Sequence, residues 1–369
     1  MLGDIMTETE LVELDITSIK GAVMSKRYLS GIQPSGVPHL GNYFGAIKEH
    51  VRQSKSLEEG DSALFFIADY HALTSFNVFS ELGMQTRAVA ATYMALGLDT
   101  KQAVFFEQSA VPEVCELNWI LACCTGMGAL QRAHSYKDKV AQGLVPNVGL
   151  FTYPVLMAAD ILIYQSTHIP VGKDQTQHVE MAQDMAGSFN ALMGAGEKVL
   201  QYPIPVMGSV PSVPGTDGRK MSKSYGNTID IFASGKKLNT VVKSIVTDSR
   251  SPDDPKDPDS IPLFGLLRCF MPTKDGDDLA AIIRAGGRGA PGYGALKALL
   301  LDYMDATFCE ARGRYEVLMN TEAGQKEVAD ALNSGAEKAR GLARETLSRC
   351  YEGIGLTNAA LRCRLTNTY

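Results

Sequence analysis

The first clear pattern in the chain joins a short strand to an amphipathic helix through a glycine-containing loop. Residues 27–30 are extended in character, and turn-forming residues 31–36 follow them. Apolar side chains then recur at helical spacing, namely Leu40, Tyr43, Phe44, Ile47 and Val51. The pattern predicts a strand, a glycine loop and a helix in direct succession.

Two more buried strands are predicted in the same part of the chain. Residues 62–68 form a short apolar run, a helix should follow and end near Gly97, and residues 103–107 have the pattern of a third strand. Strands that alternate with helices indicate right-handed crossovers and a parallel sheet. We therefore expect an α/β fold with a doubly wound, Rossmann-like parallel sheet.

The pattern changes after Ser234, where strand signals fade. A polar, proline-rich stretch at 253–262 precedes segments rich in leucine, alanine and charge, which favour helices. At 369 residues the chain exceeds the usual size of one hydrophobic core. We expect an N-terminal extension at 1–26, a Rossmann-like catalytic domain at 27–230 and a mostly helical C-terminal domain at 231–369.

Composition and cysteine usage limit the compartment. No run of about 18 uncharged apolar residues is present, which excludes a transmembrane helix and a membrane as partner. Residues before Met24 are acidic, unlike secretory or mitochondrial signals. The seven cysteines are odd in number and show no CxxC spacing, which argues against a disulfide framework and a zinc site. We expect a cytoplasmic protein.

The net charge does not by itself favour a nucleic-acid-binding protein. The formal charge is −6 and the pI is near 5.6, so any RNA contact would need a local basic patch. Basic residues of the C-terminal region alternate with acids, and they fit a solvated helix face as well as an RNA face. They are Lys326, Lys338, Arg340, Arg344, Arg349, Arg362 and Arg364.

The loop at residues 33–42 lies where a parallel strand gives way to a helix, the place where such sheets bind ligands. A nucleotide there would meet free helix amides and the positive end of the helix dipole. Gly41 would let the backbone approach it closely, and His39 and Asn42 could bond phosphate or ribose. Alone, the motif fits a structural turn with a surface histidine equally well.

A second candidate loop spans residues 218–226. It carries Lys220, Lys223, Ser222 and Ser224 between glycines, a composition suited to a triphosphate. In phosphoryl and nucleotidyl transfer the protein mostly positions groups and stabilises developing charge. Taken alone, the run is also compatible with a solvated basic loop.

Together the two loops resemble the paired signatures of class I aminoacyl-tRNA synthetases. Within that class, residues 30–36 with Gly41, Asn42 and Tyr43 look like the bacterial-type tryptophanyl-tRNA synthetases. Further matching blocks are residues 68–74, 152–162 and 170–178. The resemblance covers nearly everything after residue 26. It implies ATP-dependent activation of L-tryptophan to tryptophanyl-adenylate, transfer to tRNA(Trp), a need for Mg²⁺, anticodon recognition by the C-terminal domain and a homodimer.

One block also carries a physical argument for the amino-acid pocket. Tyr153, Met157 and Asp160 are spaced i, i+4 and i+7, so they share one helix face. Indole needs a flat apolar slot and one acceptor for its N–H, which a carboxylate supplies. A helix cap or a surface aspartate is the alternative. The tryptophan-binding residues that the resemblance implies are Leu29, Tyr153, Met157, Asp160, Ile169, Val171 and Gln175.

The resemblance also implies the nucleotide site. Lys220 and Lys223 would stabilise charge on pyrophosphate together with Mg²⁺, with His39 as a third catalytic residue, and no protein side chain would bind the metal. Lys137 is a further phosphate candidate beside Lys139. The implied ATP-binding residues are Gln33, Pro34, Ser35, Gly41, Asn42, His71, Lys139, Gly172, Lys173, Asp174, Lys220, Met221, Ser222, Lys223 and Ser224.

Three positions depart from the family pattern. Many relatives carry an aromatic residue at Leu29, an acid at Lys173 and an aspartate at Tyr225. Three alternatives stay open: a tyrosyl-tRNA synthetase, which would be expected to carry a phenol-binding residue near Leu29; a non-catalytic synthetase-like RNA-binding protein; and a small-molecule nucleotidyltransferase, which would not need the long C-terminal region.

Overall fold

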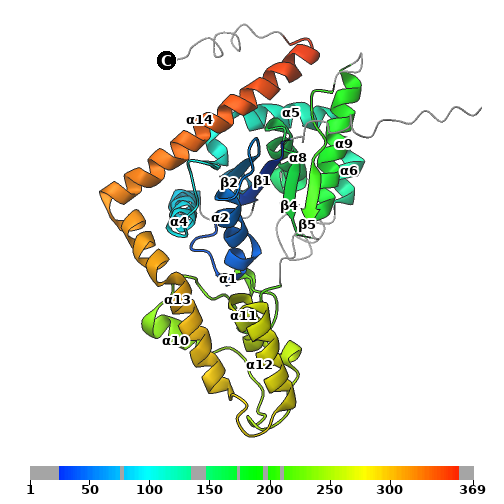
Figure 1. The fold of residues 1–369 in the computed structure, drawn as a ribbon. Coiled ribbons are helices and arrows are strands. Elements are labelled where there is room, and N and C mark those ends of the chain that lie inside the picture. The colour runs from blue at the N-terminus through cyan, green and yellow to red at the C-terminus, as the bar shows by residue number, and fades with distance from the viewer. Residues whose placement is uncertain are drawn as a thin grey trace, which may run out of the picture.

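The computed structural model describes residues 25–74, 79–133, 147–172, 175–193, 198–207 and 212–356 (Figure 1). The predicted extension therefore lies almost entirely outside the described residues. Within the described ranges, no helix is both long enough and apolar enough to cross a membrane.

A five-stranded parallel sheet forms the centre of the molecule. The strands lie in the order β3-β2-β1-β4-β5, so the chain adds β2 and β3 on one side of β1 and then β4 and β5 on the other. This reversal confirms the doubly wound fold and places a ligand-binding switch point at the carboxyl ends of β1 and β4. The strands are β1 (Arg27–Ile32), β2 (Ser62–Ile67), β3 (Val104–Glu107), β4 (His168–Val171) and β5 (Ile204–Met207).

Successive side chains of β2 enter two different cores, as the period-2 geometry of a strand requires. Leu64 and Phe66 pack on one face of the sheet, in a core that includes residues of three helices covering that face and of the final long helix. Phe65 and Ile67 pack in a second core with a helix on the other face. The three helices on the side of Leu64 are α5 (Glu113–Cys124), α8 (Val148–Ile163) and α9 (Thr176–Leu192). The helix on the side of Phe65 is α4 (Leu82–Ala95).

The helix predicted after the first loop is present but not uniform. It begins as α1 (Leu40–Asn42), continues as the π-helical segment η2 (Tyr43–Ile47) and ends as α2 (Lys48–Ser54). The third predicted strand is present as β3. The helix predicted before it is present as α4, which ends at Ala95, and Gly97 follows with a φ of +86°. That left-handed conformation suits glycine and ends the helix.

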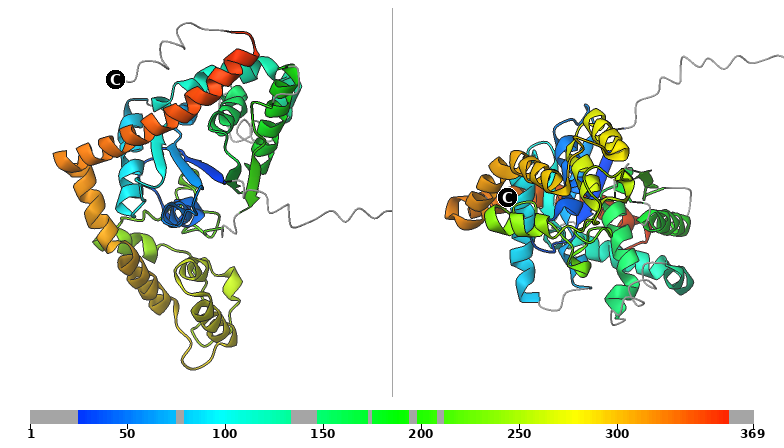
Figure 2. Two further views of the ribbon diagram at one scale, coloured as in Figure 1. Left: turned by 45° about the horizontal axis from the view of Figure 1, so that its top comes forward. Right: turned by 90° about the horizontal axis from the view of Figure 1, so that it is seen from below.

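The C-terminal region is helical, as predicted, but it is not wholly separate from the sheet (Figures 1 and 2). The final long helix α14 runs back along β3, where a Cβ on Gly335 would lie 1.9 Å from the carbonyl oxygen of Phe105. Only glycine allows this approach. The elements here are α10 (Gly235–Lys243), η7 (Pro258–Ser260), α11 (Pro262–Phe270), α12 (Thr273–Ala285), α13 (Tyr293–Asn320) and α14 (Glu322–Gly353).

Two of the C-terminal basic residues hold α14 against α5. Arg340 and Arg344 each place a guanidinium nitrogen 2.9 Å from Oε1 of the buried Glu113. Burial alone would raise the pKa of Glu113, but the hydrogen bonds from both arginines hold it below its ordinary value. These two arginines therefore serve helix packing. Lys326, Lys338 and Arg349 remain exposed on the same helix.

Candidate active site

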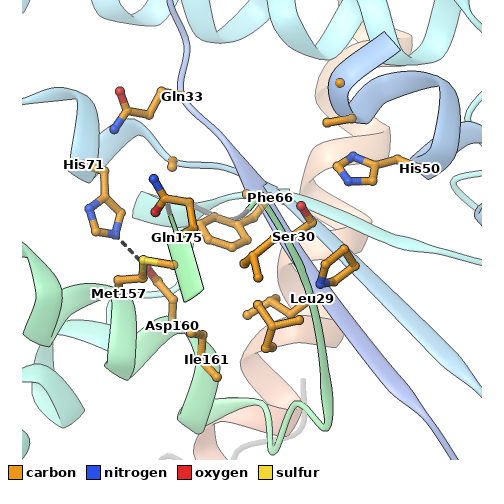
Figure 3. A pocket seen from close by; sticks show the side chains of 18 of the residues that line it. Leu29, Ser30, Gln33, His50, Phe66, His71, Met157, Asp160, Ile161 and Gln175 are labelled. Atoms are coloured by element: carbon orange, nitrogen blue, oxygen red, sulfur yellow. Dashed lines mark hydrogen bonds and ion pairs between the residues drawn. The ribbon is translucent and has the colours of Figure 1, made fainter. Parts of the chain in front are cut away.

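A cavity of about 590 Å³ opens at the switch point between β1 and β4 (Figure 3). The structure brings all seven residues of the predicted amino-acid pocket to its wall: Leu29, Tyr153, Met157, Asp160, Ile169, Val171 and Gln175. Gln33, His71 and Gly172 of the predicted nucleotide set line it as well. The cavity thus joins residues from both strands and from α8, which lie far apart in the sequence.

Asp160 is the one carboxylate on the α8 wall of the cavity. It is 1% exposed, and its Oδ2 lies 2.9 Å from Nε2 of His71. The side-chain amide of Gln108, at the start of η4 (Gln108–Ala110), donates to both carboxylate oxygens at 2.9 and 2.8 Å. Burial raises the pKa of Asp160, and the hydrogen bonds from His71 and Gln108 oppose that rise. His71 thus faces Asp160, although the resemblance implied a nucleotide contact.

The cavity wall next to Asp160 is apolar. Met157 and Ile161 from α8 face Leu29 and Phe66 of the sheet (Figure 3). A Cβ on Gly31 would lie 2.5 Å from the ring of Phe66, so the glycine lets that ring lie against β1. A flat apolar slot with one buried acceptor results.

A polar group lies beside this slot. The hydroxyl of Tyr153 is 2.9 Å from Nε2 of His178 on α9. Gln175 lines the cavity at the position just before α9. Both residues lie where a polar head group of a bound amino acid could be held.

The predicted first loop has a well-defined backbone. Asn42 accepts a hydrogen bond from the His39 amide at 3.1 Å, and the Leu40 amide donates to Ile229 at 2.9 Å. His39 itself is buried, and burial together with the charge of Lys223 lowers its pKa to about 4. Its imidazole is therefore neutral at pH 7 and can act through hydrogen bonds only.

The second predicted loop packs directly against the first. Met221 is buried, and its Sδ accepts from the Gly41 amide at 3.4 Å. The Lys223 amine donates to the carbonyl of Ser35, and to that of Val37 at 3.1 Å. Residues 180 or more positions apart in the sequence thus form one surface. Lys220 and Ser224 are exposed on it, and Ser222 is half-buried.

Asn227 fixes the shape of the second loop. Its Oδ1 accepts from the Ser222 amide at 2.8 Å, and its Nδ2 donates to Asp217 at 2.7 Å and to the Lys220 carbonyl at 3.2 Å. Gly226 follows η6 (Lys223–Tyr225) with a φ of +64° and closes the turn. Hydrogen bonds within the protein therefore hold the loop in this shape.

Some predicted residues cannot be placed, and some cavity residues were not predicted. Lys137, Lys139, Lys173 and Asp174 lie outside the described residues.

Sequence reasoning missed the contribution of Gln108, which directly follows the third predicted strand just as His71 follows the second. Polar residues at the carboxyl ends of parallel strands were therefore the available signal. Other cavity residues not predicted are Ser30, Gly31, Gly45, Ala46, Glu49, His50, Phe66, Ala68, Ile161 and Pro170.

Leu29 and Tyr225, which depart from the family pattern, can be located in the structure. Leu29 is buried at the back of the cavity and offers no hydroxyl or aromatic ring there. Tyr225 is exposed, and the guanidinium of Arg219 lies 4.3 Å from its ring centre. Its ring therefore packs on the outside of the second loop.

Comparison with known proteins agrees with these observations. Residues 24–264 match the family model of class I tRNA synthetases for W and Y. The tryptophan--tRNA ligase of Campylobacter jejuni is 46% identical over 331 residues, which are 89% of this chain and 100% of that protein. The tryptophan--tRNA ligase of Fusobacterium nucleatum is 46% identical over 90% of this chain and 98% of its own.

Solved structures give the same result. The crystal structure of C. jejuni tryptophanyl-tRNA synthetase complexed with ADP and tryptophan superimposes with a TM-score of 0.79 at 45% identity, covering 89% of this chain and 100% of that one. A tyrosyl-tRNA synthetase from Archaeoglobus fulgidus shares only the fold, with a TM-score of 0.61 at 20% identity over 80% of this chain and 92% of its own. The chain therefore belongs to the bacterial-type tryptophanyl-tRNA synthetases of class I.

Proposed function

We propose that this chain activates L-tryptophan with ATP to tryptophanyl-adenylate and transfers the aminoacyl group to tRNA(Trp). Asp160 carries the proposal, because a buried acceptor at the end of an apolar slot matches the single N–H of indole. The identities with tryptophan--tRNA ligases support the same assignment.

In this proposal the cavity holds tryptophan as follows. The indole lies between Met157 and the sheet, with Leu29, Ile169 and Val171 completing the apolar walls. Asp160 accepts the indole N–H. Tyr153 and Gln175 hold the amino and carboxylate groups, which places the carboxylate toward the first loop.

ATP would lie across the surface formed by the two loops. Gln33, Pro34, Ser35, His39, Gly41 and Asn42 would contact it from the first loop and Gly172 from the end of β4, with Lys173 and Asp174 following in sequence. The backbone amides at the start of α1 already donate within the protein, so the side chains of the two loops are left to contact the phosphates. Lys220 and Lys223, with Met221, Ser222 and Ser224 shaping the loop, would face the leaving pyrophosphate.

The chemistry needs positioning more than proton transfer. An oxygen of the already ionised tryptophan carboxylate bonds to the α-phosphorus of ATP, and the bond from that phosphorus to the bridging oxygen breaks to release pyrophosphate. A terminal adenosine hydroxyl of tRNA then attacks the carbonyl carbon and AMP leaves. Lysine amines aimed at the pyrophosphate stabilise charge that develops in the first step.

We also propose that Mg²⁺ enters with the nucleotide. Among the described residues there is no group of three or more histidine, cysteine or acidic side chains placed to hold a metal. Mg²⁺ in such sites is commonly bound through substrate phosphates, so the donors here suit a metal held by ATP. It would supply further positive charge beside Lys220 and Lys223.

Recognition of the tRNA anticodon is assigned to the helical region at 231–369. The exposed Lys326, Lys338 and Arg349 on α14 leave positive charge available, whereas Arg340 and Arg344 are engaged with Glu113. In this proposal the transfer to tRNA depends on residues that tryptophan activation does not use.

Pyrophosphate exchange tests the proposed activity. Purified protein should incorporate labelled pyrophosphate into ATP when tryptophan is present and tRNA is absent, because adenylate formation needs only the cavity and the two loops. Each other amino acid, tested in turn, serves as a control. Exchange driven by tyrosine instead, or equally without any amino acid, would refute the assignment.

We further propose that the chain acts as a homodimer. Apolar side chains are exposed on helices that contact one another: Trp119 on α5 is 71% exposed, Met127 on α6 (Met127–Arg132) 61% and Val148 on α8 78%. Exposed apolar surface of this kind is commonly covered by a partner, and a second copy would bury it.

Sedimentation checks this assembly. The wild type should sediment with about twice the 39.8 kDa mass of one chain, and Trp119→Arg should shift it toward one chain. Ile282→Arg, which charges an exposed apolar position on α12, is the matched control and should leave the mass unchanged. A wild type that sediments as a single chain at micromolar concentration contradicts the proposal.

A further inference from the structure

Asp160 is hydrogen-bonded by the protein before any substrate is present. The Gln108 amide donates to Oδ1 at 2.9 Å and to Oδ2 at 2.8 Å, while Nε2 of His71 lies 2.9 Å from Oδ2. The carboxylate therefore has a fixed orientation, and the lone pairs that are left decide what it can accept from the cavity.

The orientation of Gln108 is itself determined. Its side chain is completely buried, and its Oε1 accepts from the backbone amide of His71 at 3.3 Å. The carbonyl end of the side chain is thereby held on His71, and the NH₂ end must point to Asp160. A flipped amide would bring one donor against another and leave the carboxylate facing an oxygen.

Gln108 and His71 differ in one chemical respect. An imidazole nitrogen donates only in one tautomer or when protonated, whereas an amide donates at every pH. The other titratable groups that act on Asp160 are Asp69 on α3 (Asp69–Ala72), Cys115 on α5 and Tyr164 after α8, which are neutral or anionic. Gln108 is therefore the donor to Asp160 that depends neither on a tautomer nor on a protonation state.

The state of Asp160 matters because burial favours its protonated form. Burial raises the pKa of Asp160 above its ordinary value, and the bonds from His71 and Gln108 counteract that rise. A protonated carboxyl would turn one oxygen into a donor, and a donor aimed at an indole N–H repels it.

We infer that Gln108 is a specificity-determining positioning residue, which keeps Asp160 an oriented carboxylate so that it can select a substrate carrying a ring N–H. Gln108 acts through Asp160 and does not line the cavity. The inference rests on the proposed function, since it assumes that tryptophan occupies the slot.

The readout is the preference ratio. It compares kcat/KM in pyrophosphate exchange for tryptophan with that for an analogue carrying carbon in place of the indole nitrogen. Measured from pH 6 to pH 9, the wild-type ratio should be nearly constant. The ratio cancels general losses of activity that affect both substrates equally.

Two variants of similar size should give opposite pH dependences. Gln108→Met removes the donor, so Asp160 holds its proton to higher pH. The preference ratio should therefore fall about 10-fold at low pH, which is the loss expected for one hydrogen bond to a charged group. The ratio should recover as pH rises. Gln108→Glu keeps a donor while its own carboxyl is protonated, so its ratio should stay near wild type at low pH. As pH rises, two adjacent carboxylates repel each other, Asp160 loses its orientation and the ratio should fall.

A surface pair gives the matched control. Gln102 donates to Asp99 at 3.0 Å, but both are far from full burial, and Gln102→Met should leave the ratio unchanged at every pH. If Gln108→Met fails to fold, the slope of Gln108→Glu against wild type decides alone.

The possible outcomes are distinct. Equal, pH-independent losses in both Gln108 variants would show a packing role and overturn the inference, as would unchanged ratios. A wild type without tryptophan-dependent exchange would refute the proposed function and leave no ratio to compare. Opposite slopes in the two variants support the inference.

Discussion

Lys223→Ala is expected to lower the rate of tryptophan activation by on the order of 10²-fold while tryptophan affinity changes little. The amine binds the carbonyls of Ser35 and Val37 in the first loop, so it lies where the triphosphate of ATP would be seated. A charge directed at the leaving pyrophosphate acts mainly in the transition state, and its loss therefore lowers kcat more than it raises KM for tryptophan. Pre-steady-state measurement of adenylate formation separates the two effects.

The control for this prediction is another lysine of the same region. Lys237 is exposed, its amine lies 3.4 Å from Asp230, and it belongs to neither of the two loops. Lys237→Ala should keep the wild-type rate. If Lys223→Ala activates tryptophan at the wild-type rate but binds it more weakly, the second loop does not act on the pyrophosphate.

Asp160→Ala is expected to weaken tryptophan binding about 10- to 100-fold, with ATP affinity nearly unchanged. The lost hydrogen bond from the indole N–H to a charged acceptor is worth roughly 1.5–3 kcal/mol. ATP is assigned to the surface formed by the two loops, in the region of Gly41 and Lys223. Equilibrium titration with each ligand measures both affinities.

A second variant separates the acceptor from its packing. Removing the carboxylate also leaves the donors of Gln108 and His71 without their acceptor, which costs stability. Asp160→Asn keeps the volume, and its single oxygen in the place of Oδ2 can still accept from Gln108 and His71, while its NH₂ takes the place of Oδ1 and offers the indole N–H no acceptor. It should remain folded, as a melting curve would show, and still lose tryptophan affinity.

Much of the framework could be predicted because it depends on local periodicity. The spacing of Leu40, Phe44 and Ile47 is a helical pattern whatever the tertiary structure, and residues 62–68 are apolar because that strand is covered on both faces. Tyr153, Met157 and Asp160 could be placed on one face for the same reason. The spacing placed these residues on one helix face, and the family resemblance assigned that face to the pocket.

Other features depend on contacts that no local pattern encodes. Gln108 is 52 residues from Asp160: the pairing of β2 with β3 places it beside His71, and the packing of α8 on the sheet brings Asp160 to both. Strands β4 and β5 are four residues each and contain Pro170 and Pro205, which weakens their strand signal. The return of α14 to the sheet depends on Gly335, whose significance appears only in the packed structure.

The measurement that tests this account most directly compares tryptophan with its carbon analogue in wild type and in Asp160→Ala. A site built to hydrogen-bond a ring N–H should reject an analogue that lacks it, because the lone pair of the buried carboxylate that faces the cavity is then left without a donor. Wild type should therefore prefer tryptophan by about 10- to 100-fold, and the variant should bind both ligands about equally. If Asp160→Ala still prefers tryptophan by the wild-type margin, Asp160 does not select the substrate and the account is wrong.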